Sequence, residues 1–248
     1  MWKIFAFNDI IYENFIERNK GNNMEKLNIL YEDNHIIVVV KPVNIPSQGD
    51  KTGDEDMLTI IKQYIKEKYN KPGEVYLGLV HRLDRPTGGV MVFAKTSKAA
   101  SRLSEQVRDK KMHKKYLCIV DGKMENTTGS MRDFLIKNEK TNTSKVVKEG
   151  TKNAKEALLD YEVIKYNEEI NMSVVKVDLH TGRHHQIRVQ FASRNHSLSG
   201  DQKYGTRGRG KQLALWAFSL SFEHPTLKEE MTFENYPEMI GSWKILEN

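Results

Sequence analysis

The chain has 248 residues, a net charge of +6, and 38% hydrophobic and 29% charged residues, a balance that excludes a wholly disordered protein. Its single cysteine, Cys118, excludes an intramolecular disulfide bond and favours a reducing compartment, so we expect a cytoplasmic location. Its apolar runs, such as residues 36–40, are far shorter than the roughly 20 residues of a membrane-spanning helix, so we expect no membrane contact.

Positive charge is concentrated in two stretches of the sequence. Residues 82–115 carry ten cations and three acids, and residues 183–211 carry seven cations and one acid. Because these stretches together hold +13, the rest of the chain holds a net −7. Segregated positive charge of this kind indicates a polyanionic partner, most often nucleic acid. The alternative is a pair of solvated, lysine-rich helix faces.

Hydrophobic periodicity and turn residues predict the elements in chain order. The first half is predicted to hold strands over 27–40 with a turn at 32–34, a helix over 57–69, strands over 75–80 and 90–94, a helix capped by Ser97 that ends near Lys110, and a strand that stops at 121–122. The second half is predicted to hold a polar, turn-rich region over 123–155, strands over 157–165 and 173–179, a helix over 184–193, and strands over 213–222 and 231–233. Strand runs with separate helices indicate an α+β fold, without an internal domain boundary after residue 25.

The nonapeptide HRLDRPTGG, residues 81–89, joins two predicted strands and places Asp84 between Arg82 and Arg85. A carboxylate beside guanidinium groups stays ionised and is oriented by charge-assisted hydrogen bonds. Held rigidly in such a loop, it can act as a nucleophile. An ion pair in an ordinary turn is the simpler alternative, and the loop alone favours it. No second acid is close in sequence, so nothing here suggests a glycosidase with paired carboxylates.

A second candidate site is HTGRHHQIRVQFA, residues 180–192, where a strand ends and a helix begins. Free backbone N–H groups beside Arg183 form a natural phosphate site, with Arg188 one turn further along the helix. We expect the adjacent His184 and His185 to point to different sides. Because no cysteine or acid cluster accompanies them, we expect no metal ion.

Residues 110–116, KKMHKKY, mix cations with one aromatic residue, Tyr116. This pattern suits a segment that follows a nucleic-acid backbone and stacks a base. A frayed helix end with Tyr116 packed in the core fits the residues equally well.

Five stretches, in this order, resemble the RluA-type family of RNA pseudouridine synthases: ILYEDNHIIVVVKPVNIPSQ, GLVHRLDRPTGGVMVFAKT, KKYLCIVDG, HTGRHHQIRVQFA and SGDQKYG. The resemblance runs from about Leu27 to the segment LALWAFSLSFEHP. It implies the pseudouridine synthase fold, a mixed, mainly antiparallel sheet in two lobes with helices flanking a central cleft. It also implies the isomerisation of uridine to pseudouridine in RNA, without cofactor or metal.

By position in these motifs, Asp84 matches the catalytic aspartate, Tyr116 the active-site tyrosine, and Arg188 the arginine that pairs with the aspartate. Arg82 matches the arginine that enters the RNA stack where the target nucleotide leaves. The other candidate RNA contacts are Arg85, Lys114, Lys115, Arg183, His185 and Gln186. The family usually has serine at Gly88, histidine at Gln190 and often proline at Ser197, and these departures concern loop geometry more than catalysis.

Residues 1–24 form a predicted N-terminal extension before a catalytic domain over 25–248. The extension is too short for the additional RNA-binding domain of many relatives. It can form an amphipathic helix, but the simpler interpretation is that translation starts at Met24. Two other classes stay open: a non-catalytic RNA-binding protein on the same fold, and a metal-dependent phosphoryl-transfer or hydrolytic enzyme, for which the motifs lack ligating acids. We expect a monomer that acts on ribosomal or transfer RNA.

Overall fold

The computed structural model describes residues 27–205 and 212–247. The predicted extension 1–24 lies outside these residues, as do Arg207, Arg209 and Lys211 of the second basic stretch. No helix in the described ranges combines the length and the apolarity that crossing a membrane requires.

One sheet contains all eleven strands of the described residues. The strands are β1 (Asn28–Glu32), β2 (Ile36–Lys41), β3 (Gly78–Leu79), β4 (Gly88–Ala94), β5 (His113–Asp121), β6 (Thr128–Asn138), β7 (Thr143–Val147), β8 (Lys155–Asn167), β9 (Met172–Leu179), β10 (Leu215–Glu223) and β11 (Glu230–Glu234). The helices are α2 (Met57–Lys68), α3 (Ser97–Arg108), α4 (Gln186–Ala192) and the short 3-10 helix Gly241–Leu246.

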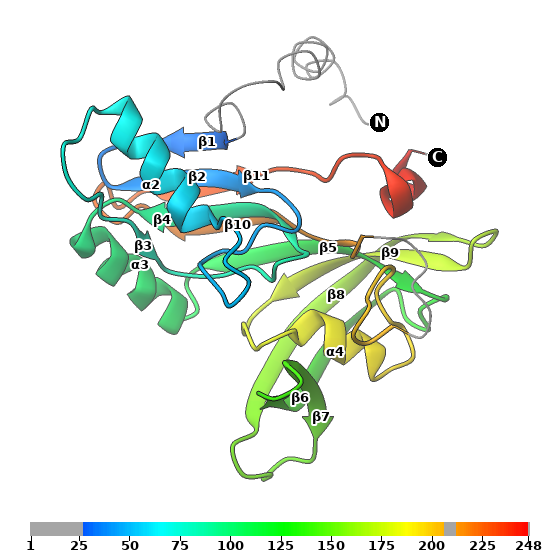
Figure 1. The fold of residues 1–248 in the computed structure, drawn as a ribbon. Helices are drawn as coiled ribbons and strands as arrows, with labels where there is room; N and C mark the ends of the chain where they lie inside the picture. Colours follow the sequence, from blue (N-terminus) through cyan, green and yellow to red (C-terminus); the bar gives the residue numbers. More distant parts are fainter. Residues whose placement is uncertain (1–26, 206–211, 248) are drawn as a thin grey trace.

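The strand order is β1-β2-β4-β10-β5-β9-β8-β6-β7, with β3 added beside β4 and β11 beside β10. Every pairing is antiparallel except that of β4 with β10. Figure 1 shows the sheet divided into two lobes: β1, β2 and β4 lie with α2 and α3, whereas β6–β9 lie with α4, and β5 runs between the two groups. The predicted α+β fold with a mainly antiparallel sheet is confirmed.

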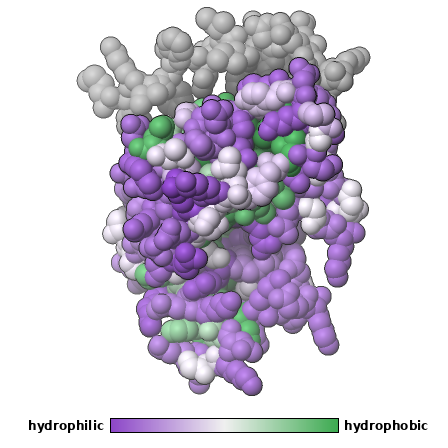
Figure 2. All heavy atoms as spheres, turned by 90° about the vertical axis from the view of Figure 1, so that its left-hand side faces the viewer, coloured by the Kyte–Doolittle hydropathy of each residue, from purple (hydrophilic) through white to green (hydrophobic). Residues whose placement is uncertain are grey.

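Strands β2 and β4 are buried on both faces, which explains their uninterrupted apolar sequences. Ile37 and Val39 pack in the cluster that contains the buried side chains of α2, and Ile36 and Val38 pack in the cluster that contains those of α3. A strand covered on both sides reads as a continuous hydrophobic run instead of an alternating one. Figure 2 shows the face of the molecule that lies on the left in Figure 1. Hydrophilic residues dominate this surface, and hydrophobic residues form small patches on it.

Four predicted boundaries are wrong. The region 123–155 is not only turns, because it holds β6, β7 and the start of β8. The strand expected over 75–80 is only Gly78–Leu79. Helix α3 is capped by Thr96, whose side chain accepts a hydrogen bond from the Ala99 N–H at 3.2 Å, and Ser97 is its first helical residue. Helix α4 starts at Gln186, because His185 has a left-handed backbone with φ 55°.

Candidate active site

The loop that carries Asp84 is held by buried polar contacts on both sides of the aspartate. The Ser47 hydroxyl donates to the Leu83 carbonyl at 2.9 Å and accepts from the Leu83 N–H at 3.1 Å. The Thr87 N–H donates to the Asp84 carbonyl at 2.9 Å. These bonds fix the backbone, while the Asp84 side chain keeps 30% of its surface exposed. The carboxylate is therefore rigidly placed and accessible.

Lys41, at the end of β2, forms hydrogen bonds that hold the same loop. Its side chain is fully buried, and its ammonium group donates to the carbonyls of Pro42, Ile45 and Arg85 at 2.8, 2.6 and 3.1 Å. Burial lowers the pKa of Lys41 to about 7, with Asp84 acting in the opposite direction and Arg85 in the same one. The Arg85 carbonyl, next to Asp84 in the chain, is thus bonded to Lys41 of the first lobe, which is the lobe that contains β1, β2 and β4.

Asp84 opens into a cleft of about 1050 Å³, lined by residues of both lobes. Nine basic side chains of the described residues line it, against two acids, Asp50 and Asp84. The basic residues are Arg82, Arg85, Arg108, Lys110, Lys114, Lys137, Arg183, Arg188 and Lys203. A cleft with this excess of positive charge attracts a polyanion.

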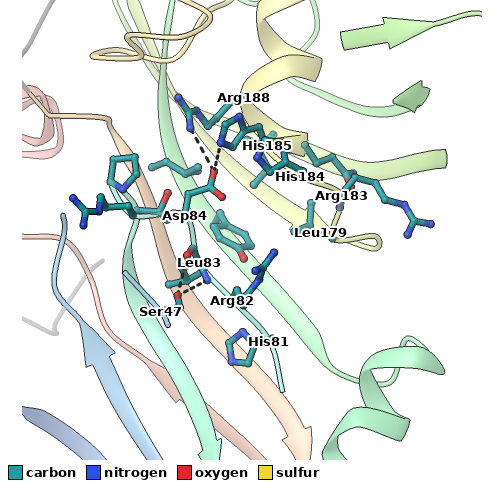
Figure 3. Close-up of a pocket in the computed structure, with 18 of the residues that line it drawn as sticks. Ser47, His81, Arg82, Leu83, Asp84, Leu179, Arg183, His184, His185 and Arg188 are labelled. Atoms are coloured by element: carbon teal, nitrogen blue, oxygen red, sulfur yellow. Dashed lines mark hydrogen bonds and ion pairs between the residues drawn. The ribbon is translucent and has the colours of Figure 1, made fainter. Parts of the chain in front are cut away.

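Two groups from the start of α4 face the same oxygen of Asp84. Arg188 Nη1 lies 3.5 Å and His185 Nε2 lies 3.6 Å from Asp84 Oδ2. Figure 3 shows both contacts converging on one carboxylate oxygen. Since charge-assisted hydrogen bonds are usually 2.7–2.9 Å long, both groups orient the carboxylate without binding it tightly.

Arg188 makes its short bonds elsewhere. Its Nε and Nη2 donate to Asp201 Oδ2 and Oδ1 at 2.8 and 2.7 Å, and the Asp201 side chain is completely buried. Burial opposes ionisation of Asp201, but the hydrogen bonds and charge of Arg188 outweigh it and lower the pKa of that carboxyl. The sequence-based pairing of Arg188 with Asp84 is therefore present at longer range, beside a tighter pair that the sequence analysis missed.

The two adjacent histidines do not point to different sides, as the sequence analysis expected. Because His185 has a left-handed backbone, its ring stacks on that of His184, with centroids 3.7 Å apart. His185 Nδ1 lies 2.8 Å from the Tyr204 hydroxyl, and His184 Nδ1 lies 2.9 Å from the hydroxyl of Ser144. Burial, and then the charge of Arg188, lower the pKa of His185 to about 2, so its ring is neutral at physiological pH.

Tyr116 lies in β5, lines the cleft and is 6% exposed. It also packs in the main hydrophobic cluster, as the second interpretation of residues 110–116 expected, and the stacking of a base on Tyr116 stays a prediction. Burial and the nearby Asp84 charge raise the pKa of Tyr116, which keeps its hydroxyl protonated.

The two arginines that flank Asp84 in sequence do not hold its carboxylate. Arg85 binds the other way, with Nη2 2.5 Å from Asp54 Oδ2 and 2.8 Å from the Thr52 hydroxyl. Arg82 lines the cleft and forms none of the ion pairs found among the described residues. The sequence-based expectation that this loop grips its own aspartate is wrong, and α4 supplies the guanidinium group.

The remaining predicted RNA contacts differ in where they lie. Lys114 lines the cleft, and burial lowers its pKa, whereas its neighbour Lys115 does not line the cleft, as expected for the opposite face of a strand. The Arg183 side chain points away from Asp84, and its Nε donates to the Glu156 carbonyl at 2.7 Å. Gln186 is 3% exposed, and its side-chain oxygen accepts from the Arg183 N–H at 3.1 Å, so its amide braces the loop.

Three residues of this site were not predicted: Lys41, Asp201 and Tyr204. Asp201 and Tyr204 belong to SGDQKYG, which contributed to the family resemblance without a role for either residue. One general signal was available, since a buried arginine near the cleft needs an acid partner. Over the described residues, no group of three or more His, Cys, Asp or Glu side chains is arranged to hold a metal ion.

The fold and the cleft together define the class of protein. Two solved human structures superpose on the chain: RNA Pseudouridylate Synthase Domain Containing 4, with a TM-score of 0.73, 24% identity and coverage of 89% of this chain and 93% of that one, and Domain Containing 1, with a TM-score of 0.71, 23% identity and coverage of 90% and 89%. At these identities the likeness shows the fold, which is that of the pseudouridylate synthase domain.

Sequence comparison gives the family. The model described as RNA pseudouridylate synthase matches residues 35–193. The chain is 38% identical over 223 residues to a protein of Aquifex aeolicus named as an uncharacterized RNA pseudouridine synthase, covering 84% of this chain and 68% of that protein. It is 32% identical to ribosomal large subunit pseudouridine synthase C of Haemophilus influenzae, covering 83% of this chain and 63% of that protein.

The chain belongs to the RNA pseudouridylate synthase family and is an isomerase that acts on RNA. The resemblance to the RluA-type members, inferred from the sequence motifs, is confirmed.

Proposed function

We propose that this enzyme converts specific uridines of ribosomal or transfer RNA to pseudouridine, with Asp84 as the nucleophile on a flipped-out nucleotide. The observation that carries the proposal is the Asp84 carboxylate, which is 30% exposed in a basic cleft with only its Oδ2 facing Arg188 and His185. Two acids, Asp84 and Asp50, line the described cleft. Asp50 Oδ2 lies 3.8 Å from Arg85 Nη2.

The reaction breaks the bond between ribose C1′ and uracil N1 and forms a bond between C1′ and uracil C5. The uracil turns while it is held in the cleft, the hydrogen leaves C5, and N1 gains one, so that substrate and product are isomers. Asp84 attacks either C1′ of the ribose or C6 of the uracil, and both routes use an ionised carboxylate. Arg188 aims that carboxylate.

Tyr116 has two roles open to it in this scheme. Its ring lines the cleft within reach of a flipped base, on which it can stack. Its second role is to shuttle a proton to and from the base; burial and Asp84 raise the pKa of its hydroxyl, which keeps it protonated in the free enzyme and makes it a weak acid.

The basic cleft is suited to an extruded nucleotide. A base inside a stem cannot reach Asp84, and flipping it out costs a few kcal/mol. Arg82, which lines the cleft and is exposed, is proposed to fill the gap left in the RNA stack, while Arg85, Lys114 and Arg183 contact flanking phosphates and Lys115, on the opposite face of β5, does not. Those contacts offset the cost of flipping and make binding sensitive to salt.

The test is to incubate the enzyme with ribosomal and transfer RNA and to measure pseudouridine, beside Asp84→Asn and a control, Asp109→Asn. Asp109 is an exposed aspartate after α3. Because the Haemophilus relative is named for the large ribosomal subunit, that RNA is tested first. We expect product from the wild type and the control, and none from Asp84→Asn.

Pseudouridine formed by Asp84→Asn at the wild-type rate would overturn the role of Asp84. Salt-sensitive binding without product on any RNA would favour the second candidate, a non-catalytic RNA-binding protein on the same fold. The cytoplasmic location and the monomeric state stay predictions.

A further inference from the structure

We infer that the turn at Asp201–Tyr204 carries two positioning residues, Asp201 and Tyr204, which aim Arg188 and His185 at one oxygen of Asp84. The inference deepens the proposed function and rests on it where catalysis is concerned. It begins from the contrast between the long contacts that Asp84 receives and the short bonds that its two neighbours make to this turn.

Asp201 sets the direction of the Arg188 guanidinium group. The two short bonds that Arg188 donates to Asp201 fix the guanidinium plane, so that Nη1, which takes no part in them, is directed at Asp84. Asp201 Oδ1 also accepts from the N–H groups of Lys203 and Tyr204 at 2.9 and 3.1 Å. One buried carboxylate therefore shapes the turn and holds the arginine.

Tyr204 sets the tautomer of the His185 ring. The Tyr204 oxygen accepts from the Ser144 N–H at 2.7 Å, and its other hydrogen bond among the described residues is the 2.8 Å contact with His185 Nδ1. If the Tyr204 hydroxyl donates to Nδ1, every hydrogen in the chain of contacts has an acceptor. If instead Nδ1 donated, the Tyr204 oxygen would accept twice and its own hydrogen would lack a partner in this set.

The neutral His185 ring then carries its hydrogen on Nε2, the nitrogen that faces Asp84 Oδ2 at 3.6 Å. An N–H directed at a carboxylate is attractive, whereas the other tautomer would set a lone pair against the negative charge. The hydrogen-bond pattern around Tyr204 and the electrostatics at Asp84 thus select the same tautomer.

Both positioned groups approach Oδ2, whereas Oδ1 makes none of the hydrogen bonds or ion pairs found among the described residues, so we assign Oδ1 as the oxygen that meets the substrate. Figure 3 shows Arg188 and His185 on one side of the Asp84 carboxylate. The turn at 201–204 makes none of the hydrogen bonds or ion pairs that Asp84 forms among the described residues, so it acts on the Asp84 carboxylate through Arg188 and His185.

Tyr204→Phe tests this inference because it removes a single oxygen and keeps the ring that packs against the Arg188 guanidinium, whose carbon lies 5.3 Å from the ring centroid. The control is Tyr166→Phe, which removes a tyrosine hydroxyl on β8 that bonds to Asn171. Asp201→Asn is the second variant, since it keeps the shape of the side chain and removes its charge.

The first readout is the ring ¹⁵N spectrum of His185 in the free enzyme. We expect a protonated Nε2 and an unprotonated Nδ1 in the wild type and in Tyr166→Phe, and a mixture of tautomers in Tyr204→Phe. The second is kinetic: kcat falls about tenfold in Tyr204→Phe and further in Asp201→Asn, while the dissociation constant for RNA changes less than about twofold.

An unchanged His185 tautomer in Tyr204→Phe overturns the inference, as does a loss of RNA affinity equal to the loss of kcat, which would mark a purely structural role. The spectrum needs no activity. If the wild type forms no pseudouridine, the proposed function fails, and the tautomer result still decides whether Tyr204 positions His185.

Discussion

The two lobes that meet at the cleft hold their candidate residues by different means. In the first lobe, the backbone of the Asp84 loop is placed by strands β2 and β4, in which every residue is buried and most side chains are apolar. In the second lobe, α4 also buries Ile187 and Phe191, but the side chains that face Asp84 are held by charges and hydroxyl groups of the turn at 201–204. Packing places the backbone of Asp84, and polar bonds direct the atoms that face its carboxylate.

This difference follows from what each interaction can specify. Apolar contacts are non-directional, so they fix where a chain segment lies without choosing which atom of a side chain points to the cleft. Hydrogen bonds to a buried carboxylate are directional and costly to leave unmade. The second lobe therefore depends on its polar partners more than the first does.

The largest effect is expected from breaking the polar pair of the second lobe. Arg188→Leu leaves the fully buried Asp201 without its charge partner, which should lower the free energy of unfolding by about 3–5 kcal/mol. The double variant Arg188→Leu/Asp201→Asn should lose much less than the two single losses together. Urea unfolding of the four proteins measures this coupling, and additive losses would show that the two side chains act independently.

A smaller loss is expected from the cluster of hydrogen bonds around the Glu32 carboxylate in the first lobe. Glu32 accepts hydrogen bonds from Lys68, Lys95, Tyr64 and Tyr69. Burial opposes its ionisation, but these bonds outweigh it and lower the pKa of Glu32 from 4.5 to about 2, which is worth on the order of 3 kcal/mol.

Because this pKa is lowered by folding, the stabilisation is fully present above about pH 4.5 and is lost as the pH falls towards 2. The wild type should exceed Glu32→Gln in unfolding free energy at pH 6, and the difference should shrink as acid is added. Unfolding curves between pH 6 and pH 2.5 measure it. Parallel pH profiles for the two proteins would contradict the lowered pKa.

The smallest effect tests the apolar packing of the first lobe. A Cβ at Gly88 would lie 2.2 Å from Trp216 Cζ3, so the serine that the family usually has there does not fit beside this tryptophan. Gly88→Ser should therefore destabilise the protein by about 1–3 kcal/mol, and Gly88→Ser/Trp216→Val should lose less than the sum of its parts.

Gly73→Ser is the control for that measurement, since a Cβ at Gly73 meets nothing within 4 Å, and its effect should stay below about 0.5 kcal/mol. Equal thermal shifts for Gly88→Ser and Gly73→Ser would show that the ring of Trp216 moves away without cost.

The sequence predicted well what depends on local pattern and on motif identity. The apolar runs at 36–40 and 90–94 correspond to β2 and β4, and the three residues matched to catalytic positions, Asp84, Tyr116 and Arg188, all line one cleft. It failed where the answer depends on contacts between distant segments. In strands β6 and β7 only Met131, Leu135 and Ser144 are buried, so their sequences lack an apolar pattern.

The choice of partners was equally hidden from the sequence. Arg85 stands next to Asp84 but binds Asp54, and Arg188 binds Asp201 more tightly than Asp84, because backbone direction decides which acid a guanidinium group reaches. The stacking of His184 on His185 depends on the left-handed backbone of His185, a conformation that an ordinary helix start does not have.

The position of β10 also sets the order of events during synthesis. It separates β4, beside the Asp84 loop, from β5, which carries Tyr116, although both of those strands precede it by a long stretch of chain. A nascent chain on the ribosome cannot join the two halves of the cleft until residue 223 has left the exit tunnel. Pairing across such a separation is slow, so we expect the enzyme to become active only after most of its chain has been translated.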